Sequence, residues 1–209
     1  MGEVKSSRRE KSEATRRKIL HAAHEEFCEK GYHGATIASI AKRAGVAGQT
    51  VYFVFHTKSA LISAVIDNLV MGEEEPTLPQ ESPWWRAMVG EPDAAAALGH
   101  FIRGAGPLFE RASTISEILR GAALTDDEVR RTHEFHEDLR RTAFREVVAT
   151  VAEKAPLRAG LTVDTATDIL LTVYGDTTYF IMTKERGWTH DQYIDWLRTA
   201  LPTLIIELQ

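Results

Sequence analysis

Few residues in this 209-residue sequence combine the types and the spacing that catalysis or metal binding requires. His133 and His136 lie three positions apart, so two imidazoles on one helix face could hold a metal ion, but no third ligand is evident. The glycine-containing runs do not match a phosphate-binding loop. A single cysteine, Cys28, excludes an intramolecular disulfide and is typical of a cytoplasmic protein. We therefore predict no catalytic residues, no metal site and no cofactor.

The charge is distributed unevenly along the chain. Residues 1–60 contain 11 lysines and arginines against 6 acidic residues, whereas the remainder contains 14 against 24. This asymmetry predicts that only the N-terminal quarter meets a polyanion such as nucleic acid. No stretch approaches the roughly 18 consecutive apolar residues that span a bilayer, so we expect no membrane partner.

Hydrophobic residues recur at three- and four-residue spacing through most of the chain, which predicts an all-α protein of about nine helices. Residues 1–11 are polar and basic and are predicted to form a flexible arm, and residues 71–83 an irregular connection. Gly104, Gly106 and Pro107 are expected to kink or split a helix, because proline removes a backbone donor. The helices are expected over residues 12–30, 36–44, 46–53, 57–70, 93–112, 125–154, 163–186 and 189–208.

The stretch "GVAGQTVYFVFHTK" (45–58) contains five β-favouring residues in a row, yet a strand here would have no partner in a helical chain. A short helix, a turn at Gly45 and a second short helix form a helix-turn-helix. In that arrangement Val46 and Val51 face inward and Phe55 plugs the core below. Tertiary packing then outweighs local propensity. We interpret the stretch as a recognition helix.

Residues 16–66 resemble the DNA-binding domain of the TetR (tetracycline-repressor) family of bacterial regulators. The resemblance is carried by "IL" 19–20, "AA" 22–23, Phe27, "KGY" 30–32, Thr36, "IA" 40–41, "AGV" 44–46, Thr50, Tyr52, Phe55 and Lys58. The stretch "ERGWTHDQYIDWL" (185–197) is similar to the start of the last helix in many actinobacterial-type members. Three residues depart from the pattern: Ala47 replaces a usual serine, Gln49 a usual glycine, and Val54 a usual histidine or tyrosine.

The resemblance implies a homodimer that represses transcription from a palindromic operator in double-stranded DNA and is released by a small-molecule effector. Gln49 has the donor and acceptor needed to pair with adenine in the major groove. Thr50, Tyr52 and Lys58 match positions that contact phosphates, which fix the register of the helix on DNA. The complete set of candidate DNA-binding residues is Arg16, Arg17, Thr36, Lys42, Arg43, Ala47, Gly48, Gln49, Thr50, Tyr52 and Lys58.

The remainder of the chain is expected to hold the effector and to form the dimer. Aromatic and polar residues could line a cavity or simply form core, and both interpretations stay open. The candidate pocket residues are Trp84, Trp85, Met88, Phe101, Phe109, Phe135, His136, Tyr174 and Asp176. The helix at 163–186 is apolar on more than one side, which favours a four-helix dimer interface with the last helix. The candidate interface residues are Ile169, Val173, Phe180, Ile194, Leu197 and Leu201, with a thick monomer core as the alternative.

These patterns predict an arm at 1–11, a helix-turn-helix domain at 12–57 and a connecting, ligand-binding and dimerisation domain at 58–209. The segment from Gly104 to Pro107 is a candidate flexible joint between effector and DNA. Two other functions remain open: an activator or ligand-independent DNA-binding regulator, and a metal-dependent helical-bundle enzyme.

Overall fold

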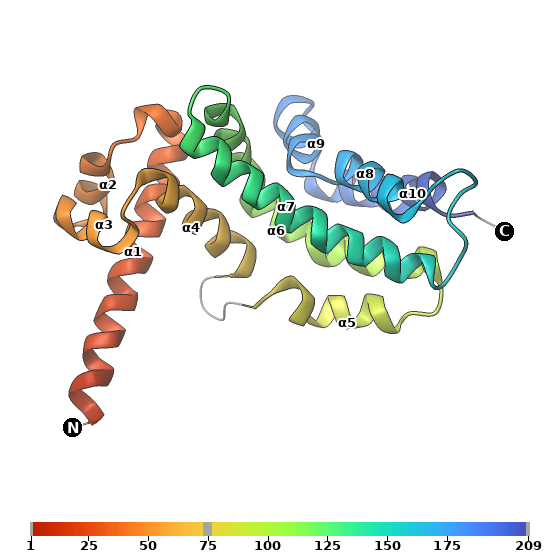
Figure 1. The fold of residues 1–209 in the computed structure, drawn as a ribbon, viewed down its shortest axis with the longest axis horizontal. Coiled ribbons are helices and arrows are strands. Elements are labelled where there is room, and N and C mark those ends of the chain that lie inside the picture. Colours follow the sequence, from red (N-terminus) through yellow and green to blue (C-terminus); the bar gives the residue numbers. More distant parts are fainter. Residues whose placement is uncertain (1, 73–76, 208–209) are drawn as a thin grey trace. The chain divides into compact units, whose positions relative to one another are not determined.

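The computed structural model describes residues 2–72 and 77–207, with side chains from residue 10 onward (Figure 1). The described residues form ten α-helices and no β-sheet, which confirms the all-α prediction. The chain divides into two compact units. The first comprises residues 1–76 and 118–133, and the second comprises residues 77–117 and 134–209. This division differs from a boundary at residue 57, so the three-part functional division stays a prediction.

The first unit is built on four helices near the N-terminus: α1 (Gly2–Gly34), α2 (Ile37–Ala44), α3 (Gly48–Phe55) and α4 (Lys58–Met71). α1 packs on α2 and α4, and α2 packs on α3. Their apolar faces meet in one buried core, because each helix carries its large apolar residues on one side. That core contains Ile19, Phe27, Ile40, Val51, Phe55, Leu61, Ile62 and Val65.

Local sequence signals set the ends of these helices. The Thr36 side chain accepts a hydrogen bond from the Ser39 amide at 3.1 Å, and the Thr57 side chain accepts one from the Ala60 amide at 3.0 Å. Gly45 ends α2 in the left-handed conformation (φ 68°), where a side chain would be strained. The helix starts expected at residues 36 and 57 and the predicted turn at Gly45 are therefore confirmed.

The prediction for residues 2–11 is wrong in one respect, because these residues are helical and belong to α1. Val4 is the one apolar residue of this stretch, which also lacks glycine after position 2 and any proline, so nothing in it interrupts a helix that continues from residue 12. The side chains of Arg8 and Arg9 lie outside the described residues.

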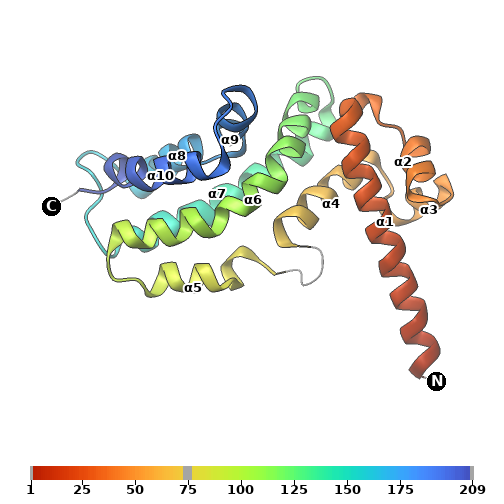
Figure 2. The ribbon, with the colours of Figure 1, turned by 180° about the vertical axis from the view of Figure 1, so that it is seen from behind.

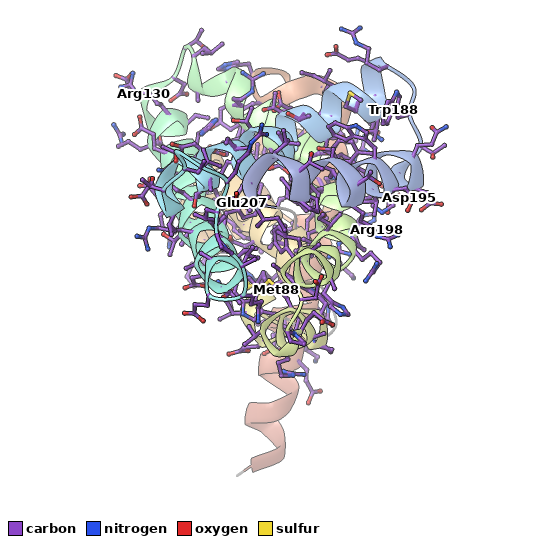
Figure 3. All side chains as sticks on the ribbon, turned by 90° about the vertical axis from the view of Figure 1, so that its right-hand side faces the viewer. Met88, Arg130, Trp188, Asp195, Arg198 and Glu207 are labelled. Carbon is purple, nitrogen blue, oxygen red and sulfur yellow. The ribbon has the colours of Figure 1, made fainter. Side chains whose placement is uncertain are left out.

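The second unit has three layers of helices, which Figures 1 and 2 show from opposite sides. The middle layer is formed by α6 (Ala94–Ala123) and α7 (Asp127–Ala152), both of which also supply residues to the first unit. On one side lies α5 (Pro83–Gly90), and on the other lie α8 (Val163–Val173) and α10 (His190–Ile205). The end-on view in Figure 3 shows Met88 on α5 beneath this middle layer, and its side chain is fully buried.

α5 was absent from the sequence prediction, although its start carries a recognisable signal. Ser82 accepts a hydrogen bond from the Trp85 amide at 3.2 Å, and Pro83 occupies the first helical position, where no amide donor is needed. A 3₁₀ turn (Pro79–Glu81) precedes it. The helix is therefore specified locally, but the surrounding prolines and acidic residues obscure it.

Two predicted helices have different courses in the structure. α6 continues through Gly104 and Pro107 as one helix, so the predicted split does not occur. The predicted helix at 163–186 is broken instead: α8 ends at Val173, a short α9 (Asp176–Phe180) follows, and residues Ile181–Glu185 form a π-helix. The break is at Gly175, where a Cβ atom would lie 2.4 Å from the Leu171 carbonyl oxygen. Only glycine permits this close approach.

Candidate nucleic-acid interface

α3 presents one polar and aromatic face to solvent. Val51 and Phe55 are buried in the core of the first unit, whereas Gln49 is exposed and Tyr52 and Phe53 are 55% and 83% exposed. His56, which is also exposed, ends the helix at a φ of 61°. The β-favouring run is therefore a helix, as predicted, but it begins at Gly48 rather than at Val46 and includes Phe55.

The first turn of α3 lacks a side-chain cap. Ala47 occupies the N-cap position and has no side-chain oxygen to accept a hydrogen bond. Gly48 follows with no atom within 4 Å of the position that a Cβ would take, so the helix start is open and accessible to a partner. Thr50 is half-buried, and Gln49 projects outward.

The missing cap has a measurable consequence. We expect Ala47→Ser to raise the free energy of unfolding by about 0.5–1 kcal/mol, because a serine hydroxyl can accept from a free amide of the first turn. Urea denaturation of the variant and the parent protein measures the difference. Thr57→Ala is the control, since it removes an existing cap and is expected to lower stability by about 1 kcal/mol. An Ala47→Ser protein no more stable than the parent would contradict the expectation.

The candidate cations divide into an exposed group and a group that forms ion pairs or hydrogen bonds within the domain. Lys42 is exposed in the last turn of α2. Arg43 instead forms ion pairs with Glu25, Glu26 and Glu29 of α1 at 2.5 to 3.1 Å, and these hydrogen-bonded carboxylates raise its pKa. Its charge is therefore balanced inside the domain, and sequence reasoning missed this because the partners lie on another helix.

Lys58 is also held by the domain itself. Its Nζ donates to the Tyr32 and Ala35 carbonyls at 2.8 and 3.1 Å, and it lies 4.3 Å from the centroid of the Tyr32 ring. Burial lowers the pKa of Lys58. A phosphate contact from this ammonium group would require breaking both hydrogen bonds. Thr36 likewise uses its hydroxyl in the capping box of α2.

Arg16 and Arg17 lie exposed on α1. The Arg16 guanidinium carbon stands 4.6 Å from the centroid of the Phe55 ring, so this cation is positioned beside the end of α3. The exposed candidates that lie on α3 or beside its end are therefore Arg16, Gln49 and Tyr52. Phe53 was missed, although positions 49, 52, 53 and 56 follow the helical spacing that puts four residues on one face.

The candidate pocket residues are largely packed core in the second unit. Phe101 contacts Trp84, Phe144 and Tyr174 with ring centroids 5.3 to 6.1 Å apart, and Phe109 lies 4.5 Å from Tyr174. Trp85 and Met88 are buried in the same cluster. The Tyr174 hydroxyl donates to the Ile102 carbonyl at 2.5 Å, and burial raises the pKa of Tyr174 well above its ordinary value.

Three candidate pocket residues lie outside that aromatic cluster. Phe135 is 54% exposed and its ring contacts the ring of His136, which is buried. Asp176 is buried and forms an ion pair with Arg140 of α7, which also pairs with Glu137 at 2.6 Å. Burial is the main cause that raises the pKa of Asp176, while Arg140 acts in the opposite direction.

A surface groove of about 460 Å³ lies elsewhere, between α6 and α10. Ala95, Ala96, Gly99 and Arg103 line it from α6, and Asp195, Arg198 and Thr199 line it from α10. Figure 3 shows Asp195 and Arg198 on the side of α10 that adjoins α6. No candidate pocket residue lines this groove.

The predicted dimer interface is wrong for its three residues on α10. Ile194, Leu197 and Leu201 are buried in the core of the second unit within a single chain, so they are not available to a partner. Ile169, Val173 and Phe180 are half-buried, which leaves part of each side chain accessible. Trp196 is the aromatic residue that α10 leaves 38% exposed, and its ring contacts Trp188 at 6.0 Å.

The described part of the chain contains no group of three or more histidine, cysteine or acidic side chains arranged to hold a metal ion. No single described helix has the length and hydropathy to cross a membrane; α3 and α4 satisfy those criteria only when taken together across a 71° bend.

The fold and the exposed face of α3 define a helix-turn-helix protein. The family model for bacterial regulatory proteins of the tetR family matches residues 19–65. This match identifies residues 19–65 as a DNA-binding domain of the tetR type, as the sequence motifs predicted.

The chain is 49% identical over 53 residues to the uncharacterised HTH-type transcriptional regulator YvdT of Bacillus subtilis, a match covering 25% of this chain and 27% of YvdT. It therefore spans about a quarter of that relative's length.

Two solved structures share the fold over nearly the whole chain. NalD of Pseudomonas aeruginosa, the secondary repressor of the MexAB-OprM multidrug efflux pump, superposes with a TM-score of 0.71 at 21% identity, covering 95% of this chain and 100% of NalD. FadR of Bacillus subtilis in complex with stearoyl-CoA superposes with a TM-score of 0.66 at 19% identity, covering 91% and 97%.

Proposed function

We propose that this protein is a cytoplasmic, homodimeric repressor that binds a palindromic operator through α3 and is released by a small-molecule effector. The observation that carries the proposal is the exposed face of α3 on an intact helix-turn-helix domain that matches the family. Two copies of α3 would enter successive major grooves about 34–36 Å apart, so the centres of the two operator half-sites would lie about one helical turn of DNA apart.

The exposed residues have distinct roles in this proposal. Gln49 reads a base edge, because its amide can both donate to and accept from adenine. Tyr52, Lys42, Arg16 and Arg17 contact the phosphate backbone and fix the register. Arg43 and Lys58 hold the domain together, since their charged groups already have partners within it.

Dimerisation and release involve the second unit. The accessible parts of Ile169, Val173 and Phe180 support a partner surface on α8 and α9, to which Trp196 adds an exposed ring on α10. NalD is a repressor of an efflux pump and FadR was solved with stearoyl-CoA, which supports an apolar or amphipathic effector here. Such an effector releases DNA only if it binds the DNA-incompetent dimer more tightly than the competent one.

In-vitro selection of duplexes from a random pool tests this function. We expect a palindromic consensus, and fluorescence anisotropy should show affinity falling about 10³–10⁵-fold between 50 and 200 mM salt for roughly 6–10 phosphate contacts. Lys42→Ala should reduce the slope of log affinity against log salt by about 1 per protomer. Arg186→Ala, which removes an exposed cation of the second unit, is the matched control and should leave that slope unchanged.

Two results would contradict the proposal. Salt-sensitive binding without enrichment of any sequence would exclude a specific operator. A selected site without two-fold symmetry would exclude the dimeric arrangement of the two α3 helices.

A further inference from the structure

Phe53 is a large apolar residue whose side chain is not packed into the core of the domain. It is 83% exposed, whereas Val51 and Phe55, two positions before and after it, are buried. No aromatic ring among the described side chains contacts it. Since water disfavours exposed apolar surface and no packing in the domain requires this ring, its position points to a contact outside the chain.

The neighbours of Phe53 indicate what that contact is. Gln49 lies four positions earlier on the same exposed face, one helical turn away, and Tyr52 is adjacent. One turn of an α-helix advances about 5.4 Å, and successive bases on a strand are about 3.4 Å apart. A residue one turn from Gln49 therefore meets a neighbouring base pair when α3 lies in the major groove.

The major groove offers one apolar group to such a ring. The edges of guanine, cytosine and adenine present donors and acceptors there, while thymine alone adds a C5-methyl group. The phenylalanine side chain has no hydrogen-bond donor or acceptor, so it can distinguish thymine from the other bases only by contact with that methyl group.

We propose that Phe53 selects thymine by packing on its C5-methyl group, in each operator half-site, within a base pair or two of the one that Gln49 reads. This inference rests on the proposed function, because it places α3 in the major groove. It makes Phe53 a specificity-determining residue and predicts an A·T-containing segment in the half-site.

Substitution of deoxyuridine for thymidine tests the proposal, because it removes the methyl group and leaves base pairing intact. With the selected operator, replacing each thymidine in turn, we expect one position per half-site where wild-type affinity falls about fourfold, the effect of losing one buried methyl group. Replacing both symmetric positions should lower it about 16-fold, since the two contacts are separate.

Phe53→Ala supplies the matching protein change. It should bind the thymidine operator more weakly than wild type but bind the thymidine and deoxyuridine operators equally at that position. Phe53 is exposed, so the variant should retain the thermal midpoint of the parent protein. Leu124→Ala is the control, because Leu124 is an equally exposed apolar side chain (80%) outside α3, and it should keep the full deoxyuridine effect.

The outcomes separate this inference from the proposed function. If an operator is selected but no deoxyuridine substitution weakens binding, the thymine contact is wrong and the repressor function stands. If Phe53→Ala keeps the deoxyuridine effect, another residue contacts the methyl group and the assignment to Phe53 is overturned. If no operator is enriched, the proposed function and the thymine contact fall together.

Discussion

Arg140→Ala is expected to lower the free energy of unfolding by about 3–5 kcal/mol at neutral pH. Asp176, at the start of α9, is buried, and its carboxylate is paired with the Arg140 guanidinium across the interior of the second unit. Removing the cation leaves a buried anion without its ion-pair partner, which costs much more than losing an exposed ion pair. Urea denaturation monitored by circular dichroism measures the loss.

The pH dependence of that loss identifies its cause. Burial raises the pKa of Asp176 in the folded protein, so the protonated carboxyl favours folding. The stability that this protonated form contributes is present at low pH and is lost as the pH rises through the folded pKa. Without Arg140 the folded pKa rises further. The deficit of Arg140→Ala relative to the parent protein should therefore shrink as pH falls from neutrality towards the ordinary carboxyl range.

A second substitution provides the control. Adding Asp176→Asn to Arg140→Ala removes the buried charge, so the double variant should recover much of the lost stability and show no pH-dependent deficit of its own. A deficit that is equal at every pH, or that Asp176→Asn fails to reduce, would mean that Arg140 stabilises the fold through its packing.

Gly104→Ala is expected to destabilise the protein by about 1–3 kcal/mol, because it overpacks a filled interface. A Cβ atom at this position would lie 2.2 Å from Cγ and 2.5 Å from Cβ of Trp84, so α5 itself would have to shift. Gly121→Ala is the matched control on the same helix, since no atom lies within 4 Å of its Cβ position. Replacing that glycine should stabilise the helix by up to about 1 kcal/mol. Thermal denaturation of both variants measures the contrast.

Gly104→Ala also tests the hypothesis of a flexible joint at Gly104–Pro107. If glycine is required at position 104 for close packing, Gly104→Ala lowers the thermal midpoint, and release of DNA by the effector changes no more than this loss of stability accounts for. If glycine is required there for flexibility, Gly104→Ala leaves the thermal midpoint near that of the parent protein and still impairs release of DNA by the effector. The continuous course of α6 and the contact with Trp84 favour close packing.

Local sequence determined the N-terminal domain of this protein. The caps at Thr36 and Thr57 and the left-handed turn at Gly45 follow from side chains within a few residues of each other, and the four-residue spacing of Val51 and Phe55 places both on one helix face. Such signals act over one or two helical turns, so a single sequence shows them. The family motif lies in this same region, and it indicated the candidate interface for DNA.

Tertiary structure alone decided which residues remain available for function. Arg43 and Lys58 carry the charge expected of phosphate contacts, but their partners, Glu29 of α1 and the Tyr32 and Ala35 carbonyls, lie on other segments. Periodicity showed that α10 has an apolar stripe but could not show what covers it, and Leu197 and Leu201 proved to be core. Phe53 was left exposed by the same packing. A hydrophobic pattern specifies that a face is buried, whereas the partner that buries it depends on contacts between residues far apart in the chain.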